Sequence, residues 1–110
     1  MTITPKQILA KSSDIVVTLT VINMKTEAVI DLSGASLIEF RLRANLLKAV
    51  AKAETAAFVT DGQDGQIQFT TSKTTFDVSG DWNVQAYIEM AGYEGYTTSN
   101  VLKVLPVIEA

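Results

Sequence analysis

The chain has 110 residues, the length of a single domain with one hydrophobic core. Its residues are 47% apolar and 19% charged, the net charge is −3, and only two arginines are present, Arg41 and Arg43. This composition excludes a disordered segment, and the charge argues against a nucleic-acid partner, because phosphate contacts require a basic patch. No apolar run approaches the ~18 residues of a transmembrane helix, so we expect no membrane partner.

The sequence contains no cysteine and no histidine. It therefore has no disulfides or thiolate ligands, and it lacks the commonest general base and the commonest transition-metal ligand. A histidine-containing catalytic triad and a histidine-based zinc site are both excluded. We expect no enzyme activity, no cofactor and no metal site, and the composition favours a structural or binding module.

Residues 1–13 precede the first long apolar stretch, and apolar residues lie on both sides of Pro5. This segment lacks the charged start and apolar run of a secretory signal, so we expect synthesis in a cytoplasm without export through a signal peptide. We interpret residues 1–13 as an arm or edge strand, which adds either to its own sheet or to that of a neighbouring subunit. Residues 14–110 are then one β-sandwich domain.

The remaining chain is rich in residues that favour strands, because 33 of the 110 residues are valine, isoleucine or threonine. Alternation of apolar and polar residues predicts strands at 14–23, 36–44, 66–70, 81–90 and 100–108, with a short extended piece at 28–34. Pro106 cannot donate a ladder hydrogen bond, so the last strand lies at an edge or ends there. The inward positions predict a core of Val17, Leu19, Val21, Ile38, Phe40, Leu42, Ile67, Phe69, Trp82, Val84, Ile88, Leu102 and Val104.

Residues 45–58 fit two interpretations. The segment is rich in alanine, leucine, lysine and glutamate, which favour a helix. Against a helix, Lys48 and Lys52 would be like charges one turn apart, and an extended chain would place alanines along one face. The residues alone leave both interpretations open.

The segment Asp61–Gly65 contains two Asp-Gly pairs, which are typical of hairpin turns. Its carboxylates also suggest a calcium loop, but the pattern of an EF-hand requires a glutamate at the twelfth position, where this chain has Ser72. We therefore expect a plain hairpin turn. A calcium ion held with carboxylates from elsewhere, such as Asp77 or Asp81, is the alternative.

Glu39 and Glu89 lie on outward faces of predicted strands, where they could be neighbours, as the paired carboxylates of glycosidases are. The simpler interpretation is a solvated sheet face on which Arg41 and Arg43 pair with these carboxylates. We favour that interpretation over a catalytic pair.

Three tyrosines are the candidate contact residues. Tyr87 points outward from the strand at 81–90, and Tyr93 and Tyr96 lie in a loop flanked by glycines. Exposed tyrosines offer a large contact area at low entropy cost, which suits stacking on a sugar or anchoring a protein neighbour. The alternative is an ordinary hairpin whose tyrosines cover a sheet edge.

Several short motifs occur in an order that resembles a known family. Asp-Leu-Ser-Gly-Ala at 31–35 precedes the alternating strand at 38–43, Gly-Gln-Ile-Gln-Phe follows at 65–69, and Gly-Asp-Trp-Asn-Val-Gln-Ala-Tyr-Ile at 80–88. This order resembles the small immunoglobulin-like domains of tailed-bacteriophage virions, most of all the N-terminal domain of the phage baseplate upper protein family. The resemblance covers residues 15–107.

The resemblance implies an all-β fold, an immunoglobulin-like antiparallel β-sandwich of about seven to nine strands in two sheets, and it favours a strand at 45–58. It implies a non-enzymatic structural component of a virion, in the tail or baseplate or on the capsid surface. Such a protein would act through contacts with other virion proteins and with itself, as a homo-oligomer. The alternative is a carbohydrate- or receptor-binding module that uses Tyr87, Tyr93 and Tyr96 on a host-surface glycan.

Overall fold

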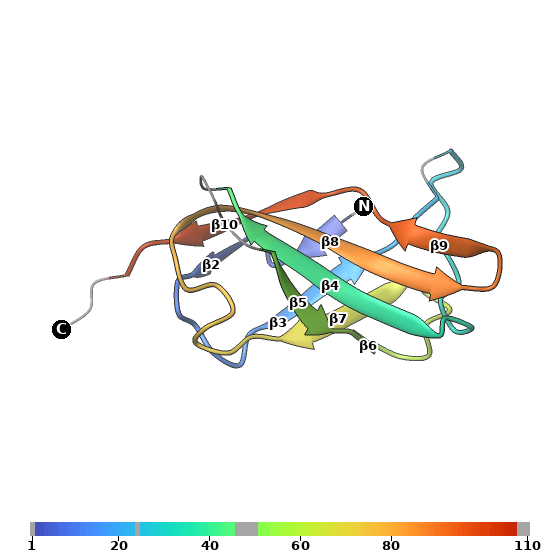
Figure 1. Ribbon diagram of the computed structural model, residues 1–110, viewed down its shortest axis with the longest axis horizontal. Coiled ribbons are helices and arrows are strands. Elements are labelled where there is room, and N and C mark those ends of the chain that lie inside the picture. The colour runs from blue at the N-terminus through green and yellow to red at the C-terminus, as the bar shows by residue number, and fades with distance from the viewer. Residues whose placement is uncertain (1, 24, 46–50, 108–110) are drawn as a thin grey trace.

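A computed structural model of the chain describes residues 2–23, 25–45 and 51–107, and these residues form strands and loops but no helix. Two sheets pack against each other as a sandwich, with the apolar core between them (Figure 1). The all-β fold predicted from the alternating pattern is therefore confirmed, and the two packed sheets make it a sandwich, as expected.

The smaller sheet has four strands in the order β1 (Thr2–Thr4), β3 (Val16–Thr20), β7 (Gln66–Thr70) and β6 (Ala57–Phe58). The larger sheet has the order β2 (Gln7–Leu9), β10 (Asn100–Leu105), β8 (Gly80–Met90), β4 (Leu37–Ala44) and β5 (Lys52–Thr55). A sixth strand, β9 (Tyr93–Tyr96), pairs with β8. All pairs are antiparallel except β2 with β10, which is parallel.

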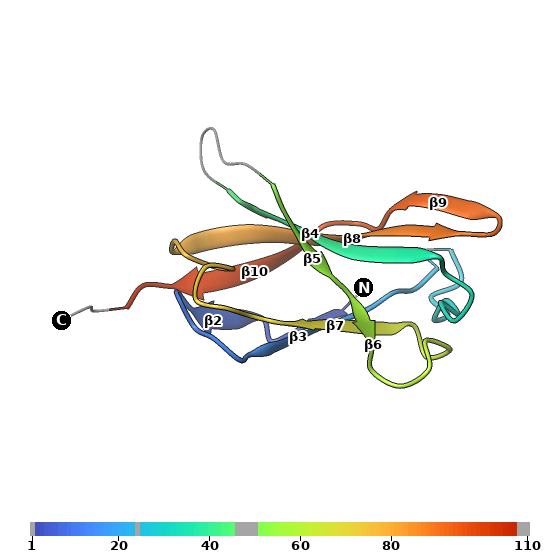
Figure 2. The ribbon, with the colours of Figure 1, turned by 60° about the horizontal axis from the view of Figure 1, so that its bottom comes forward.

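At two of the places where the chain passes between the sheets, one short strand follows another with only one or two residues between them. The chain leaves the smaller sheet after β1 and joins the larger one at β2, and it makes the reverse passage at Ala56 between β5 and β6 (Figure 2). The four strands involved occupy the sheet edges and have only two to four residues each. Such short edges offer little backbone for pairing with another chain.

The described residues contain ten strands rather than the seven to nine expected. The passages from β1 to β2 and from β5 to β6 each divide one segment into two short strands, and β9 lies where a loop was expected. The piece at 28–34 forms only an isolated bridge between Ile22 and Val29 instead of a strand. For 45–58, the strand interpretation is confirmed over β5 and β6, while residues 46–50 lie outside the described part of the chain. The last strand ends at Leu105, just before Pro106.

The core agrees closely with the alternating pattern. Twelve of the thirteen predicted core residues are buried, and Ile38 is half-buried against the same cluster. Four aromatic side chains form a continuous row through this core, with ring-centroid distances of 4.7, 6.3 and 5.1 Å between successive neighbours. The row consists of Phe40, Phe69, Phe76 and Trp82.

The Asp31–Ala35 motif is a turn that places Leu32 in the core. The Asp31 carboxylate accepts hydrogen bonds from the hydroxyl of Ser33 at 2.6 Å and from its backbone N–H at 2.9 Å. These two bonds, the hydroxyl bond first, hold the pKa of Asp31 below its usual value. The backbone N–H of Leu32 donates to Gly62, which ties this motif to the turn between β6 and β7.

The turn between β6 and β7 uses its own carboxylates. Asp61 Oδ1 accepts the backbone N–H of Gln63 and Asp64 Oδ1 that of Gln66, both at 3.0 Å, while Asp64 Oδ2 accepts the hydroxyl of Thr60 at 2.9 Å. The expected hairpin turn is confirmed, and its carboxylates stabilise the turn itself.

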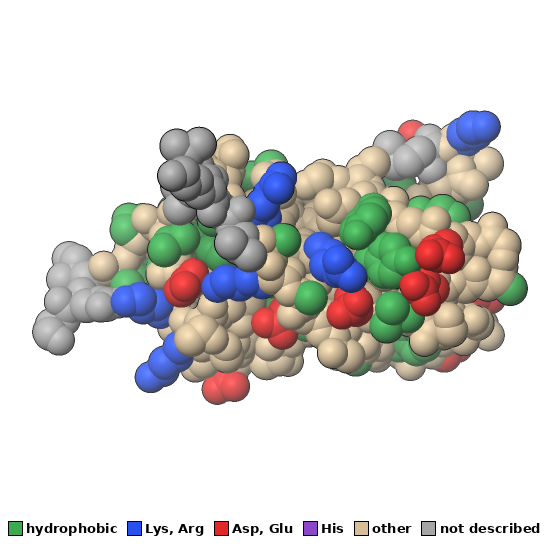
Figure 3. Space-filling model, viewed as in Figure 1, with side chains coloured by type: hydrophobic (Ala, Val, Ile, Leu, Met, Phe, Trp, Pro, Cys, Tyr) green, Lys and Arg blue, Asp and Glu red, His purple; other side chains and the backbone are tan. Residues whose placement is uncertain are grey.

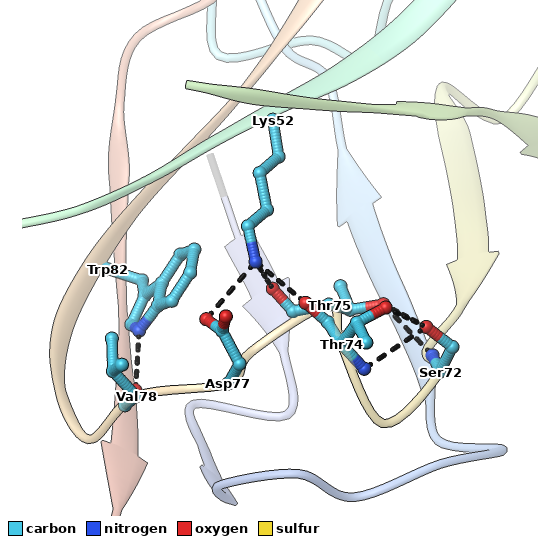
Figure 4. Close-up of polar contacts among 7 residues, drawn as sticks. All are labelled: Lys52, Ser72, Thr74, Thr75, Asp77, Val78 and Trp82. Carbon is cyan, nitrogen blue, oxygen red and sulfur yellow. Dashed lines mark hydrogen bonds and ion pairs between the residues drawn. The ribbon is translucent and has the colours of Figure 1, made fainter. Parts of the chain in front are cut away.

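Lys52 connects β5 to the loop between β7 and β8 (Figure 4). Its Nζ donates to the carbonyls of Thr74 at 2.6 Å and Thr75 at 3.2 Å and to Asp77 Oδ1 at 3.1 Å, and it lies 5.2 Å from the centre of the Trp82 ring. All three ammonium protons thus have acceptors. Asp77, considered above as an alternative calcium ligand, pairs with this lysine.

We expect Lys52→Met to lower the free energy of unfolding by about 1–3 kcal/mol, because the aliphatic stem is kept while the bonds to the loop are lost. Lys73→Met is the matched control, since Lys73 is an exposed lysine on the same loop, and it should change stability by less than about 0.5 kcal/mol. Urea denaturation measures both. Equal effects would contradict a special role for Lys52.

Candidate functional site

The outward side of the larger sheet collects the polar and aromatic side chains of β4, β8 and β9. Register places Glu39 opposite Tyr87, Tyr87 opposite Tyr96, and Glu89 opposite Glu94. Because side chains alternate along a strand, these residues share one side of the sheet. We call this surface the tyrosine face, formed by Glu39, Arg41, Arg43, Tyr87, Glu89, Glu94 and Tyr96.

Arg41 lies over two tyrosine rings at the centre of the tyrosine face. The rings of Tyr87 and Tyr96 have centroids 4.9 Å apart, and the Arg41 Cζ lies 5.3 Å and 5.9 Å from them. Its Nη2 donates to Glu39 Oε1 at 3.1 Å, while its Nε is buried and has no hydrogen-bond partner among the described residues. The guanidinium is thus held by stacking and by one ion pair.

Tyr87 also holds two carboxylates together. Its hydroxyl donates to Glu89 Oε1 at 2.8 Å and lies 3.0 Å from Glu94 Oε1. The bond to Glu89 is the main cause that raises the pKa of Tyr87, followed by desolvation and the bond to Glu94. Glu89 and Glu94 are like charges directly opposite each other, an arrangement that destabilises a strand pair unless something bridges it.

The raised pKa of Tyr87 predicts how stability depends on pH in alkali. A phenol whose pKa is higher in the folded than in the unfolded chain contributes stability that is lost as pH rises above the unfolded value of about 10. We expect Tyr87→Phe to make the decline of stability above that pH less steep. Thermal unfolding of both proteins from neutral to alkaline pH measures this, and equal slopes would contradict the prediction.

A one-residue bulge follows Tyr96, where the partner of β8 changes from β9 to β10. From Tyr87 to Val84 the strand β8 advances three residues, while the facing chain advances four, from Tyr96 to Asn100. Within the bulge, Thr97 Oγ1 accepts the backbone N–H of Ala86 at 2.9 Å. One strand edge of β8 thus pairs with β9 over one half and with β10 over the other.

Tyr93 lies on the opposite side of β9, because it faces the partly buried Met90. It lines an apolar cleft of about 580 Å³ between β9 and the segments around Val21 and Ile30. The Tyr93 hydroxyl donates to the Tyr96 carbonyl at 3.1 Å, so its polar atom is used within the protein. The cleft has the volume of a small-molecule site, but this hydroxyl and that of Thr97 are already bonded to backbone groups.

A second hollow, of about 480 Å³, lies on the tyrosine face beside Tyr96. Figure 3 shows a hydrophobic patch over β8 and β9, with basic side chains on one flank and acidic ones on the other. The hollow lies on the basic flank, and its lining includes Arg41, Arg43, Asn83, Gln85 and Ser99.

The structure brings Tyr87 and Tyr96 together and places Tyr93 elsewhere. Tyr93–Tyr96 form the edge strand β9 of a hairpin instead of a loop, which agrees with the hairpin that the sequence left as the alternative. A tight turn at Gly92, with φ of 81°, folds these residues back onto β8. The expectation of a loop left Glu94 out of the candidate residues, although Glu94 and Tyr96 alternate as strand residues do. Arg41 pairs with Glu39 on its own strand rather than across strands.

Comparisons with protein-family models, curated proteins and solved structures found no match to this chain. Among the described residues, no group of three or more metal-ligating side chains lies close enough to hold an ion. The described part of the chain contains no helix with the length and apolar surface needed to span a membrane. The tyrosine face, with its exposed aromatic and charged side chains, is the strongest candidate for a functional surface.

Proposed function

We propose that this chain is a non-enzymatic, immunoglobulin-like structural domain of a bacteriophage virion that acts through contacts with other virion proteins and with itself. The strand order supports the fold assignment. The order β1-β3-β7-β6 corresponds to A-B-E-D of an immunoglobulin sandwich, and β10-β8-β4 corresponds to G-F-C. The motif order that resembles tailed-phage domains supports the location.

The stacked Arg41, Tyr87 and Tyr96 carry the proposal. Tyrosine and arginine dominate the energetics of protein interfaces, and Tyr96 is 53% exposed at the surface. The ring stack and the ion pair to Glu39 already hold these side chains in place, so binding costs little further side-chain entropy. A partner that packs on this face would bury aromatic area on a preformed surface.

Light scattering after size exclusion, over a wide range of concentrations, tests self-assembly. We expect a mass above the 11.9 kDa of the single chain that rises with concentration, and a lower mass for Tyr96→Ala. Val16→Ala is the matched control, because Val16 is exposed on the other sheet. A wild-type protein that stays monomeric at every concentration would contradict self-assembly.

The hollow beside Tyr96 favours a second candidate, a carbohydrate-binding module. Sugar sites combine an exposed aromatic ring with converging polar groups, and here the groups of Arg41, Asn83 and Gln85 converge beside Tyr96. A glycan-binding screen separates the two candidates. Saturable binding that Tyr96→Ala abolishes, by a protein that stays monomeric, would favour the module over the assembly domain.

A further inference from the structure

We propose that the tyrosine face is a two-fold interface between copies of this chain, in which the Arg43 end of one face lies over the Glu89 and Glu94 end of the other. This inference rests on the proposed function, because it names the partner and the arrangement through which the chain would assemble.

The tyrosine face separates its charges along the strands. Arg43 is opposite Asn83 near the start of β8, while Glu89 lies six residues further along the same strand, with Glu94 beside it on β9. At ~3.3 Å per residue, the basic and acidic ends are about 20 Å apart. The stacked tyrosines lie between these ends.

Among the described residues, no ion pair neutralises the charges at the two ends. The ion pairs seen between two described side chains are Arg41 with Glu39 and Lys52 with Asp77. Arg43, Glu89 and Glu94 therefore have no ion-pair partner among these residues, and the two carboxylates lie directly opposite each other. A surface that brought a positive charge to Glu89 and Glu94 would relieve their repulsion.

A second copy supplies that surface through a two-fold axis. An axis in the plane of the interface and perpendicular to β8 places the basic end of each face over the acidic end of the other. An axis parallel to β8 would place like charges over each other. Two-fold interfaces require a self-complementary patch, and the charge order from Arg43 through Tyr87 to Glu89 is self-complementary in the first arrangement.

The edges of the two sheets are weaker candidates than the tyrosine face for contact between copies of the chain. Five short strands form these edges, β1, β2, β5, β6 and β9, and none exceeds four residues. Association by strand addition would therefore form few backbone hydrogen bonds. Packing of face on face leaves the existing ladders intact.

The size of the tyrosine face predicts the strength of pairing. Its longest strand, β8, has eleven residues, so the face is about 35 Å long. With a width of about 15–20 Å over four neighbouring strands, each copy would bury roughly 600 Å², near the lower limit of specific interfaces. We therefore expect dimers that dissociate on dilution. Many such contacts within one larger assembly would strengthen one another.

Charge reversal tests the arrangement. Arg43→Glu in one protein, and Glu89→Lys with Glu94→Lys in a second, each place like charges over each other in the homodimer. We expect each to raise the dimer dissociation constant about tenfold or more. An equimolar mixture of the two proteins should form a heterodimer about as tight as the wild-type dimer, because both contacts become attractive again. Native mass spectrometry and sedimentation measure these species.

The control is Lys73→Glu, which changes the net charge as Arg43→Glu does but lies on a loop outside the tyrosine face. It should leave dimerisation unchanged, and circular dichroism checks that each variant is folded. A wild-type dimer that is insensitive to both reversals, or reversals that the mixture does not rescue, would overturn this interface and leave the proposed self-assembly standing. A wild-type protein that never associates would instead overturn the self-assembly itself.

Discussion

Trp82→Ala will lower the free energy of unfolding by about 3–5 kcal/mol, the largest loss we expect from one substitution. Trp82 is 2% exposed, and its ring lies 5.1 Å from that of Phe76 in an edge-to-face arrangement. Its Nε1 donates to the carbonyl of Val78 at 3.0 Å, which holds the loop before β8. Alanine removes the ring that both the core and the bonded Lys52 contact, and it leaves a cavity.

Urea denaturation with a linear extrapolation measures this loss. Trp82→Phe is the informative companion, because it keeps an aromatic ring and removes the bond to Val78; it should cost about 1–2 kcal/mol. If alanine costs no more than phenylalanine, the loop bond and not the buried ring would be the source of stability.

Gly65→Ala will lower the free energy of unfolding by about 2–4 kcal/mol, from a strained backbone and a steric clash. Gly65 has φ of 71°, and a Cβ at this position would lie 2.8 Å from the Val21 carbonyl and 3.1 Å from that of Ile30. These groups cannot move freely, because Val21 donates to the Gly65 carbonyl and accepts from the N–H of Ile30. The substitution therefore separates the β6–β7 turn from the end of β3.

Gly92→Ala is the matched control for this second prediction. Gly92 has φ of 81° but open space around its Cβ position, so alanine there should cost only about 1 kcal/mol, from the backbone alone. The difference between the two variants isolates the contact with Val21 and Ile30. Thermal or urea unfolding measures both variants. Equal losses of unfolding free energy would contradict the steric argument.

Alternation alone predicted the parts of the fold whose strands bury one side throughout. The expected strand at 66–70 coincides with β7, and those at 36–44 and 81–90 differ from β4 and β8 by one residue at the start. A period of two is a local property, so it is readable from neighbouring residues. Leu32 and Phe76 were missed as core residues because they lie in turns, where no period exists.

The segments that change sheets were harder to predict. Lys52 and Glu54 occupy the inward positions of β5, opposite Leu42 and Phe40, so the strand shows no apolar face. One inward position of β5 holds Lys52, which donates hydrogen bonds to the loop between β7 and β8. Its acceptors lie more than twenty residues away in the sequence. Propensity therefore left helix and strand equally open for this region.

The sequence by itself determined that the chain is an all-β sandwich, which residues of its long strands form the core, and that it has neither histidine nor cysteine chemistry. Only the tertiary structure decided that Arg41 stacks on Tyr87 and Tyr96 and that Glu94 joins Glu89 at one end of the face. The reason is register: backbone hydrogen bonds align β4, β8 and β9, and a slip of one residue would send every side chain of a strand to the other side of the sheet.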